Sequence, residues 1–360
     1  MKKKRILIAP LDWGLGHATR CIPIIHELIA KNTEVIIAAD NRPAELLKKE
    51  FPDLQHIRFP GYTLNYPVNG NMAWAMFRQL HTLFLGISAE HKYLKKIIKE
   101  HSIDAVISDN RWGVYSKTIP SIYIVHQLRI LLSHSIQWGQ RIVDFENRQL
   151  IKNFSEIWIP DFDNDQNLSG ELSHSSRMPK NSFFIGPVSR LVKLDGIRKE
   201  IDVLVILSGP EPQRTIFEEM ITYQLKETQL RSLIVKGTPE KNFKLKLTDT
   251  ITIVSSLTSS ELSQAISSTQ IVISRPGYST VMDLSFLGAN AIFIPTPQQT
   301  EQEYLSKRLK EQRICYSETQ SGFSLSRALE QSNSYSGFSQ LQNDYSILQQ
   351  RIDHLLKSIP

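Results

Sequence analysis

The stretch "SRPGYSTVMDLSFLGANAIFIPTPQQTEQEYL", residues 274–305, contains the pattern of a strand, a turn, a helix and a second strand. The first strand is expected to end at Ser274, where the tripeptide RPG turns the chain into a helix that runs to Leu287. Gly288 has the place of the left-handed residue that commonly follows a helix. Two strands joined through a helix are typical of a parallel sheet. The stretch therefore predicts an α/β unit.

The same alternation extends through the chain in two series, which meet at a polar, basic segment at residues 186–200. The expected strands lie at residues 5–10, 34–40, 104–109, 121–126 and 156–161 in the first series and at 202–207, 230–237, 250–256, 269–274 and 290–295 in the second. Runs that are apolar on both faces indicate parallel sheets covered on both sides. We predict two Rossmann-like α/β domains, residues 1–188 and 189–340, and a last helix within 341–360 that is a candidate to cross back.

The composition is that of an ordinary globular protein, with 41% hydrophobic and 22% charged residues in 360. Cys21 and Cys315 are far apart, which disfavours a disulfide framework or a thiolate metal site and favours a cytoplasmic setting. The first apolar run is too short for a signal peptide, and no run is long enough to span a membrane. A net charge of +6 fits spare surface lysines or anionic ligands, and no nucleic-acid-binding motif is present.

The N-terminal stretch "ILIAPLDWGLGHATR", residues 6–20, places a glycine loop between a strand and a helix. Such a loop favours an anion, because free N–H groups and the helix dipole face it. At the positive end of a helix His17 is expected to stay neutral, which suits a general base, although local packing is the alternative. A dinucleotide site is a further alternative, with Asp40 as the ribose-binding acid, but Thr19 replaces the third glycine of its motif.

The motifs of residues 274–305 resemble the C-terminal, nucleotide-sugar-binding half of GT-B glycosyltransferases. The likeness is to glycosyltransferase family 28 and its peptidoglycan UDP-N-acetylglucosamine transferase group. These enzymes have an R-x-G-x-x-T-x-x-E turn and helix, a G-x-P-x-[IL]-x-x-P strand and a loop that contains a glutamine. The resemblance implies a ribose contact for Asp283, a donor-sugar contact for Gln302 and a nucleotide site shaped by three further residues. Those three are Arg275, Gly277 and Thr280.

The N-terminal loop also agrees with this resemblance, which thus covers most of the chain. The family's G-x-G-H loop is matched by Gly14, Gly16 and His17, and the family's histidine is a candidate base at the acceptor or diphosphate. The GT-B fold implies two Rossmann-like domains whose parallel sheets face each other across a cleft. Ligands of such sheets are expected at the carboxyl ends of the strands.

Three positions depart from the family pattern. Asp283 replaces a glutamate and is one methylene shorter, and Asn290 stands where the family has a proline. The family's phosphate-binding GGSxG loop is here "LSGPEPQR", residues 207–214, whose two prolines lack N–H donors. Ser208 and Gly209 remain, and we expect Arg214 to supply the missing positive potential.

The segment "DNRWG", residues 109–113, follows a predicted strand. Asp109 is expected to orient His17, to act as the base or to bind the acceptor, and Trp112 is expected to stack on a sugar; a simple turn is the alternative. The run "PDFDNDQN", residues 160–167, lacks the glycine and glutamate of a calcium loop and is interpreted as a solvated loop. No metal site is expected.

Residues 72–100 are apolar early and basic late. They predict either a helix that holds the acceptor or lies on a membrane surface, or an amphipathic helix packed on the sheet. In the related peptidoglycan enzyme the equivalent domain docks on the membrane.

Together these patterns predict an inverting, metal-independent glycosyltransferase that uses a nucleotide-diphosphate sugar, expected to be a UDP-sugar, and needs no cofactor. Its expected partners are this donor, an acceptor that is a glycan, a lipid-linked or a small molecule, and a membrane surface; no nucleic acid is expected. The expected location is the cytoplasm or the inner face of the membrane. The alternatives are a UDP-sugar 2-epimerase of the same fold, an NAD-dependent enzyme and a relative that only binds the nucleotide.

Overall fold

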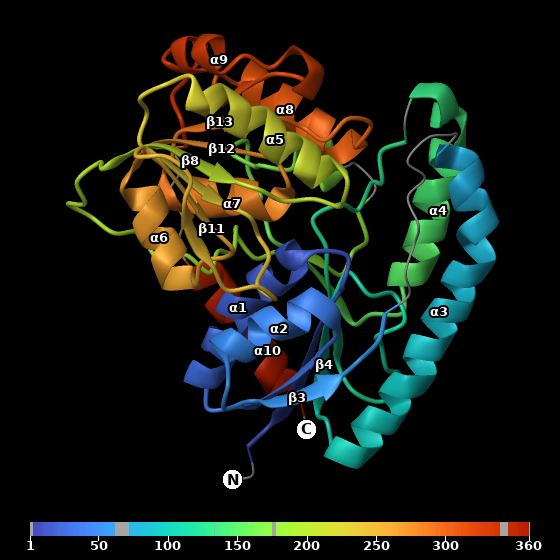
Figure 1. Ribbon diagram of the computed structural model, residues 1–360. Helices are drawn as coiled ribbons and strands as arrows, with labels where there is room; N and C mark the ends of the chain where they lie inside the picture. The colour runs from blue at the N-terminus through green and yellow to red at the C-terminus, as the bar shows by residue number, and fades with distance from the viewer. Residues whose placement is uncertain (1–2, 62–71, 133, 175–177, 339–344, 360) are drawn as a thin grey trace. The chain divides into compact units, whose positions relative to one another are not determined.

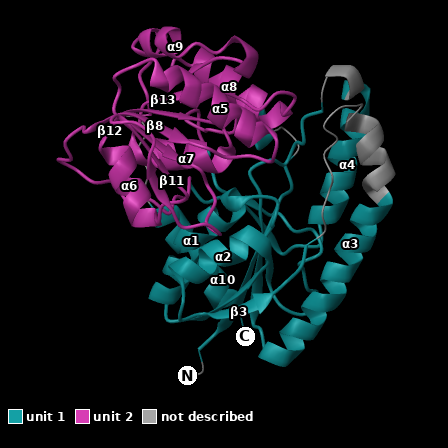
Figure 2. Ribbon diagram, viewed as in Figure 1, with its two compact units in different colours: residues 1–163, 171–186, 345–360 teal, residues 164–170, 187–344 magenta. Residues whose placement is uncertain are grey.

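The computed structural model describes residues 3–61, 72–132, 134–174, 178–338 and 345–359, which form two compact units (Figures 1 and 2). Unit 1 comprises Met1–Asp163, Glu171–Gly186 and Tyr345–Pro360, and unit 2 comprises Asn164–Gly170 and Pro187–Asp344. Each unit is an α/β structure with a parallel or mostly parallel sheet of seven strands among the described residues. The predicted fold class is confirmed.

The sheet of unit 1 is parallel between all neighbours, in the order β3-β2-β1-β4-β5-β6-β7. Its strands are β1 (Arg5–Pro10), β2 (Glu34–Ala39), β3 (Gln55–Arg58), β4 (Ala105–Asp109), β5 (Ser121–Ile124), β6 (Glu156–Ile159) and β7 (Ser182–Phe184). The strand order reverses between β1 and β4, and in doubly wound sheets such a switch point opens a crevice at the carboxyl ends. Residues that directly follow β1 and β4 are thus placed for ligand chemistry.

Helices connect these strands (Figure 1). They are α1 (Leu15–Ala30), α2 (Asn41–Glu50), α3 (Met72–His101), α4 (Gln140–Ile151) and α10 (Ser346–Ser358), with short 3-10 turns η1 (His134–Gly139) and η2 (Gly170–Leu172), the last of which begins in unit 2. The sequence pattern places the start of helix α1 at His17, whereas the helix begins two residues earlier, at Leu15. The predicted C-terminal helix begins at Ser346, and residues 341–344 lie outside the described residues.

Helix α10 is held on unit 1 by a cluster of charges around Glu156 of β6. The Nε and Nη2 atoms of Arg351 lie 2.9 Å and 2.5 Å from the two carboxylate oxygens of Glu156. Trp158 Nε1 also donates to this carboxylate at 2.8 Å. The guanidinium of Arg351 stacks 3.4 Å from the ring centroid of Phe183 on β7. The C-terminal helix α10 therefore packs on the sheet of unit 1, which contains the first strands of the chain.

The sheet of unit 2 has the order β10-β11-β9-β8-β12-β13-β14 and is parallel except for the β10–β11 pair. Its strands are β8 (Ile201–Ile206), β9 (Ser232–Val235), β10 (Lys244–Lys246), β11 (Ile251–Val254), β12 (Thr269–Ser274), β13 (Ala291–Phe293) and β14 (Tyr316–Ser317). The order reverses here between β8 and β12. The loops that follow these two strands take the place that the loops after β1 and β4 have in unit 1.

The helices of unit 2 are α5 (Gln213–Lys226), α6 (Ser259–Ser267), α7 (Tyr278–Leu287), α8 (Thr300–Glu311) and α9 (Leu325–Ser332), with a 3-10 turn η3 (Gln320–Gly322). Gly288 ends α7 in the left-handed conformation, with φ of 64°, as its sequence position predicted. Residues 187–200 contain neither helix nor strand. Val188 and Leu191 are nevertheless buried, so the start of the polar segment at residues 186–200 is packed rather than exposed.

Four strands escaped the sequence analysis. β3, β7 and β10 contain no buried residue, and β14 has only two residues. All four lie at an edge of their sheet, where each pairs with one longer strand, and none has a long apolar run. Period and apolarity identify strands that are buried on both faces, so these four left too weak a pattern.

We expect Glu156→Gln to lower the free energy of unfolding by about 2 kcal/mol, because it removes the ion pair with Arg351. The burial of this pair lies between that of a surface ion pair and that of a fully buried one. Both side chains of the pair are largely buried, at 14% and 17% exposed. Thermal unfolding should show the loss as a lower melting temperature. Asp249→Asn, which removes an exposed carboxylate near Lys246, is the control and should leave unfolding unchanged. Equal melting temperatures for Glu156→Gln and the wild type would contradict the anchoring role.

Candidate active site

The loop after β1 leads into α1 through Gly14, an exposed residue at the N-cap position. No side chain caps the helix, and no acidic residue lies in its first turn. A Cβ atom added to Gly14 would meet no heavy atom within 4 Å, so a ligand has room to approach the backbone here. The first turn of α1 therefore combines positive dipole potential with an accessible loop.

His17, in this first turn, contacts Asp109, the last residue of β4. His17 Nδ1 lies 2.6 Å from Asp109 Oδ1. β1 and β4 are neighbours with Pro10 opposite Asp109, and this pairing places the carboxylate beside the start of α1. The Asp109 side chain is fully buried, whereas that of His17 is 16% exposed. The structure thus brings together the two residues predicted to perform catalysis.

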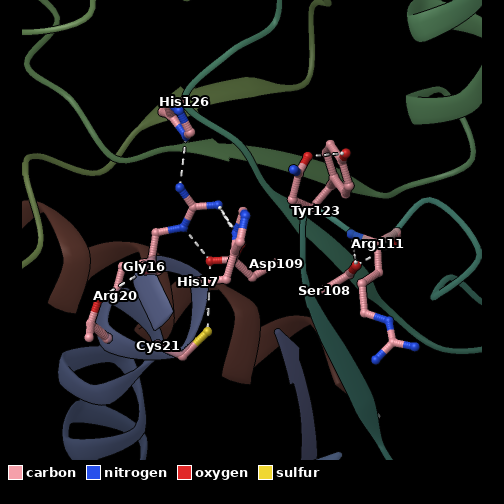
Figure 3. Close-up of polar contacts among 11 residues, drawn as sticks. Gly16, His17, Arg20, Cys21, Ser108, Asp109, Arg111, Tyr123 and His126 are labelled. Atoms are coloured by element: carbon pink, nitrogen blue, oxygen red, sulfur yellow. Dashed lines mark hydrogen bonds and ion pairs between the residues drawn. The ribbon is translucent and has the colours of Figure 1, made fainter. Parts of the chain in front are cut away.

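Arg20 completes a buried network around Asp109 (Figure 3). Its Nε and Nη2 atoms donate to the two carboxylate oxygens of Asp109. Its Nη1 atom lies 2.8 Å from Nδ1 of His126, which follows β5. The thiol of Cys21 lies 3.8 Å from Asp109 Oδ2. The sequence pattern did not indicate Arg20, Cys21 or His126 as site residues, although Arg20 and Cys21 follow His17 by three and four residues and so share its helix face.

Burial lowers the pKa of His17, and the nearby Arg20 cation lowers it further, while Asp109 acts in the opposite direction. Burial alone would raise the pKa of Asp109, but Arg20 and His17 together hold it below its ordinary value. Burial and Asp109 raise the pKa of the Cys21 thiol. At neutral pH the network therefore contains a neutral imidazole, an ionised carboxylate and a protonated thiol.

Arg111 and Trp112, which follow Asp109, pack in the interior of unit 1. Arg111 is fully buried, pairs with Glu90 at 2.7 Å and donates to the carbonyls of Phe59 and Pro60. Its side chain points away from the network of Arg20 (Figure 3). Trp112 is half-buried and packs against an apolar cluster around Tyr123. A sugar-stacking role for Trp112 stays a prediction.

In unit 2 the loop after β8 contains Ser208 and Gly209. Gly209 has φ of 98°, a conformation that favours glycine. A Cβ atom there would meet only Thr296 Oγ1, at 3.9 Å, so open space lies above this loop. Arg214, at the start of α5, donates to Glu211 of the same loop at 2.9 Å and 2.5 Å. Glu211 therefore offsets the positive potential that the sequence led us to expect from Arg214.

Arg275, after β12, is fully buried rather than exposed to a ligand. Its Nη1 atom donates at 2.9 Å to the carbonyls of Ile294 and Pro295, and its Nη2 atom donates to Gln213 at 3.2 Å. Burial lowers the pKa of its guanidinium to about 10. Arg275 thus joins the end of β12, the loop after β13 and the start of α5, which is compatible with a shaping role.

Helix α7 begins after Gly277 with no side-chain cap and no acidic residue in its first turn. A Cβ atom at Gly277 would meet nothing within 4 Å, so this helix N-terminus is also approachable. Thr280 and Asp283 follow on one helix face, three residues apart, and both are partly buried. Asp283 Oδ1 accepts a hydrogen bond of 2.5 Å from the Ser189 hydroxyl. The ribose contact that the resemblance implies for Asp283 stays a prediction.

Gln302 lies in the first turn of α8, and its side chain folds back toward the end of β13. Its Oε1 atom accepts from the Thr296 backbone N–H at 2.8 Å. This bond orients the side-chain amide, and the donor-sugar contact expected of Gln302 stays a prediction. The predicted donor residues of unit 2 thus lie after β8 and β12, at the start of α5, on α7 and at the start of α8.

The aspartate run at residues 160–167 is only partly the solvated loop that we expected. Asp163 and Asp165 are exposed, but Asp161 is buried and accepts hydrogen bonds from the Phe162 N–H at 2.8 Å and from His174 Nε2 at 3.3 Å. Within the described ranges no three His, Cys, Asp or Glu side chains gather in a way that could hold a metal ion.

The family comparison concerns the C-terminal part of the chain. Residues 213–350 match the glycosyltransferase family 28 C-terminal domain. No curated protein matches the chain by sequence.

Solved structures resemble the whole chain at low sequence identity. The glycosyltransferase of kitacinnamycin has a TM-score of 0.64 and 12% identity, with 100% of both chains covered. MurG of Acinetobacter baumannii has a TM-score of 0.55 and 14% identity over 99% of this chain and 100% of its own. LpCGTa, solved in complex with UDP, has a TM-score of 0.59 and 11% identity over 99% and 94%. The predicted GT-B fold and the resemblance to family 28 glycosyltransferases are confirmed.

The predicted membrane or acceptor segment forms most of α3, and the side chains of residues 72–80 lie outside the described residues. Phe84 and Leu85 on α3 are exposed, as are Ile142 and Phe145 on α4. Among the helices of the described part, none is long and apolar enough to cross a membrane. Membrane contact stays a prediction, which binding to anionic vesicles would test.

Asp283 predicts a pH dependence of stability. Burial raises its pKa to about 6 from an ordinary value of 3.8, against the opposing effects of Arg190 and Ser189. The native state then binds more protons than the unfolded state between these values, so stability falls as the pH rises through this window. The difference between these two pKa values corresponds to at most about 3 kcal/mol. Asp283→Asn removes this titration.

We therefore expect the melting temperature of Asp283→Asn to gain on that of the wild type as the pH rises from 4 to 7.5. Thermal unfolding at several pH values measures the difference. Asp163→Asn, at an exposed carboxylate, is the control and should follow the wild type throughout. A constant difference between Asp283→Asn and the wild type would show that the folded protein does not raise the pKa of Asp283.

Proposed function

We propose that the protein transfers a sugar from a nucleotide-diphosphate sugar, expected to be UDP-linked, to an acceptor hydroxyl with inversion at the anomeric carbon. The contact between His17 and Asp109, at 2.6 Å beside an approachable helix N-terminus, carries this proposal. The family 28 domain supports sugar transfer.

His17 is the proposed general base. Its Nδ1–H donates to Asp109, so Nε2 has the lone pair that can accept a proton. The acceptor oxygen attacks the anomeric carbon as its proton moves to Nε2, and the bond from that carbon to the phosphate oxygen breaks. The bonding electrons leave with the nucleotide diphosphate. Asp109 orients the imidazole and stabilises the imidazolium that forms, in the manner of the carboxylate in hydrolase triads.

The proposed donor site lies at the carboxyl ends of β8 and β12 in unit 2. The uncapped start of α7 and the open backbone at Gly209 and Gly277 suit the diphosphate, whose developing charge the helix N-terminus stabilises. Asp283 Oδ2 would bind the ribose, and Gln302 Nε2 the donor sugar. The structural likeness to a protein solved with UDP supports the choice of UDP.

The acceptor is proposed to approach from unit 1, near the loop of Gly14 and Gly16. Its hydroxyl has to reach His17 Nε2 within hydrogen-bond distance for the proton transfer. The exposed apolar side chains of α3 and α4 favour an acceptor with an apolar part.

The donor site is tested by thermal unfolding with UDP, GDP, dTDP, ADP or NAD. A ligand at about 100 times its dissociation constant adds about 2.7 kcal/mol, so we expect UDP to raise the melting temperature by several degrees. Asp283→Ala should abolish this shift. Ser189→Ala is the matched control, because it removes the contact to Asp283 but keeps the carboxylate, and it should retain the shift. Stabilisation by NAD alone, or a UDP shift in Asp283→Ala, would contradict the proposed donor site.

The base is tested by UDP release from UDP-sugars in the presence of alcohol, glycan and polyprenyl acceptors. We expect His17→Ala to lower the acceptor-dependent rate by about 10²- to 10⁴-fold, the range of general-base catalysis. His26→Ala, an exposed histidine on the same helix, should keep the rate of the wild type. A His17→Ala rate equal to that of the wild type would rule out the base role. A rearranged sugar formed without acceptor would favour an epimerase instead.

A further inference from the structure

We propose that Arg20 is a positioning residue for the base, because its single guanidinium fixes Asp109 and His126 and lies against His17 in one buried network. The inference rests on the proposed role of His17 in proton transfer. In this proposal the geometry of the His17–Asp109 pair depends on Arg20. Arg20 also links the pair to a second histidine, His126.

The geometry of Arg20 uses the whole guanidinium fork. The side chain is 1% exposed, and Nε and Nη2 grip the two oxygens of Asp109. A bidentate pair of this kind fixes the plane of a carboxylate as well as its position. Since the Asp109 carboxylate cannot rotate without breaking both bonds, Oδ1 stays directed at His17 Nδ1.

The network also determines which nitrogen of each histidine holds its proton. A guanidinium only donates hydrogen bonds, so His126 Nδ1, at 2.8 Å from Arg20 Nη1, has to present a lone pair and its proton sits on Nε2. His17 Nδ1 lies 2.6 Å from Asp109 and 2.9 Å from Arg20 Nη2. The shorter contact to an ionised acceptor assigns the proton to His17 Nδ1. With the proton on Nδ1, the contact between Arg20 Nη2 and His17 Nδ1 is electrostatic, because it places a positive charge beside the imidazole.

Charge balance gives Arg20 a second effect on His17. Arg20 already neutralises Asp109, so protonation of His17 adds an uncompensated positive charge to a buried cluster. The groups that face His17 are Asp109 from β4, Arg20 from its own helix and His126 from the segment after β5. Burial is the main cause of the lowered pKa of His17, and Arg20 adds to it, which favours a neutral imidazole that can accept a proton.

A purely structural role is the competing explanation, since a buried arginine also holds α1 against β4. Tautomers and titration distinguish the two. In ¹⁵N spectra of histidine-labelled protein, assigned with His17→Ala and His126→Ala, we expect His17 as the Nδ1–H tautomer and His126 as the Nε2–H tautomer. In Arg20→Met, His126 should lose this preference and the titration midpoint of His17 should rise by about one pH unit or more.

The same variant should move the acidic limb of kcat/KM to higher pH by the same amount. Arg20→Lys keeps the charge without the fork, so the limb should stay in place while kcat falls about tenfold, the loss expected from a modest misplacement of the base. Arg351→Met, which removes a largely buried arginine from a carboxylate outside the network, controls for lost stability and should change neither readout.

The proposal is overturned if Arg20→Met alters only the melting temperature and leaves the tautomers, the titration of His17 and the pH profile unchanged, or if Arg20→Lys keeps the kcat of the wild type. Should Arg20→Met fail to fold, Arg20→Lys and the tautomer of His126 in the wild type still decide the question. The outcome is separate from that of the proposed function: an active His17→Ala would remove the base role, whereas the histidine spectra would still report whether Arg20 sets the network.

Discussion

Asp109 is a charged carboxylate with no exposure to solvent, and much of unit 1 around the switch point is arranged to satisfy it. Isolated charge in an interior is strongly unfavourable, so the site needs donors on every side. The first turns of α1 supply an imidazole and a guanidinium, and the parallel pairing of β1 with β4 brings them into range. The position of α1, the orientation of His17 and the contact with His126 all follow from this requirement.

Unit 2 meets a similar constraint with the opposite charge. Arg275 is buried at the end of β12 and is neutralised by no carboxylate among the described contacts; backbone carbonyls surround it instead, and its guanidinium stacks 4.4 Å from the Phe217 ring centroid. These carbonyls belong to loops that border the proposed donor site. Each unit thus has a buried arginine at its switch point: Arg20 orients a side chain, and Arg275 shapes the backbone around it.

The sequence predicted those parts of the molecule that depend on local pattern. Continuous apolar runs identified the central strands, and Gly288 marked the end of α7 because its conformation suits glycine. His17 and Asp109 were identifiable because ligand chemistry gathers at strand ends. Arg20 was not, since an arginine inside a helix is usually exposed and its partners come from distant segments. The neutralisation of Arg214 by Glu211 likewise depends on side-chain geometry that no spacing rule gives.

The cysteines have a practical consequence for studying motion between the units. Cys21 and Cys315 are both buried and free, with thiol pKa values raised by burial, so neither is a ready nucleophile toward maleimides or spin-label reagents. The two native cysteines should therefore add little background signal when a surface cysteine is labelled. One cysteine introduced on the surface of each unit would provide a selective pair of probes, and the distance between them could be followed as nucleotide is added.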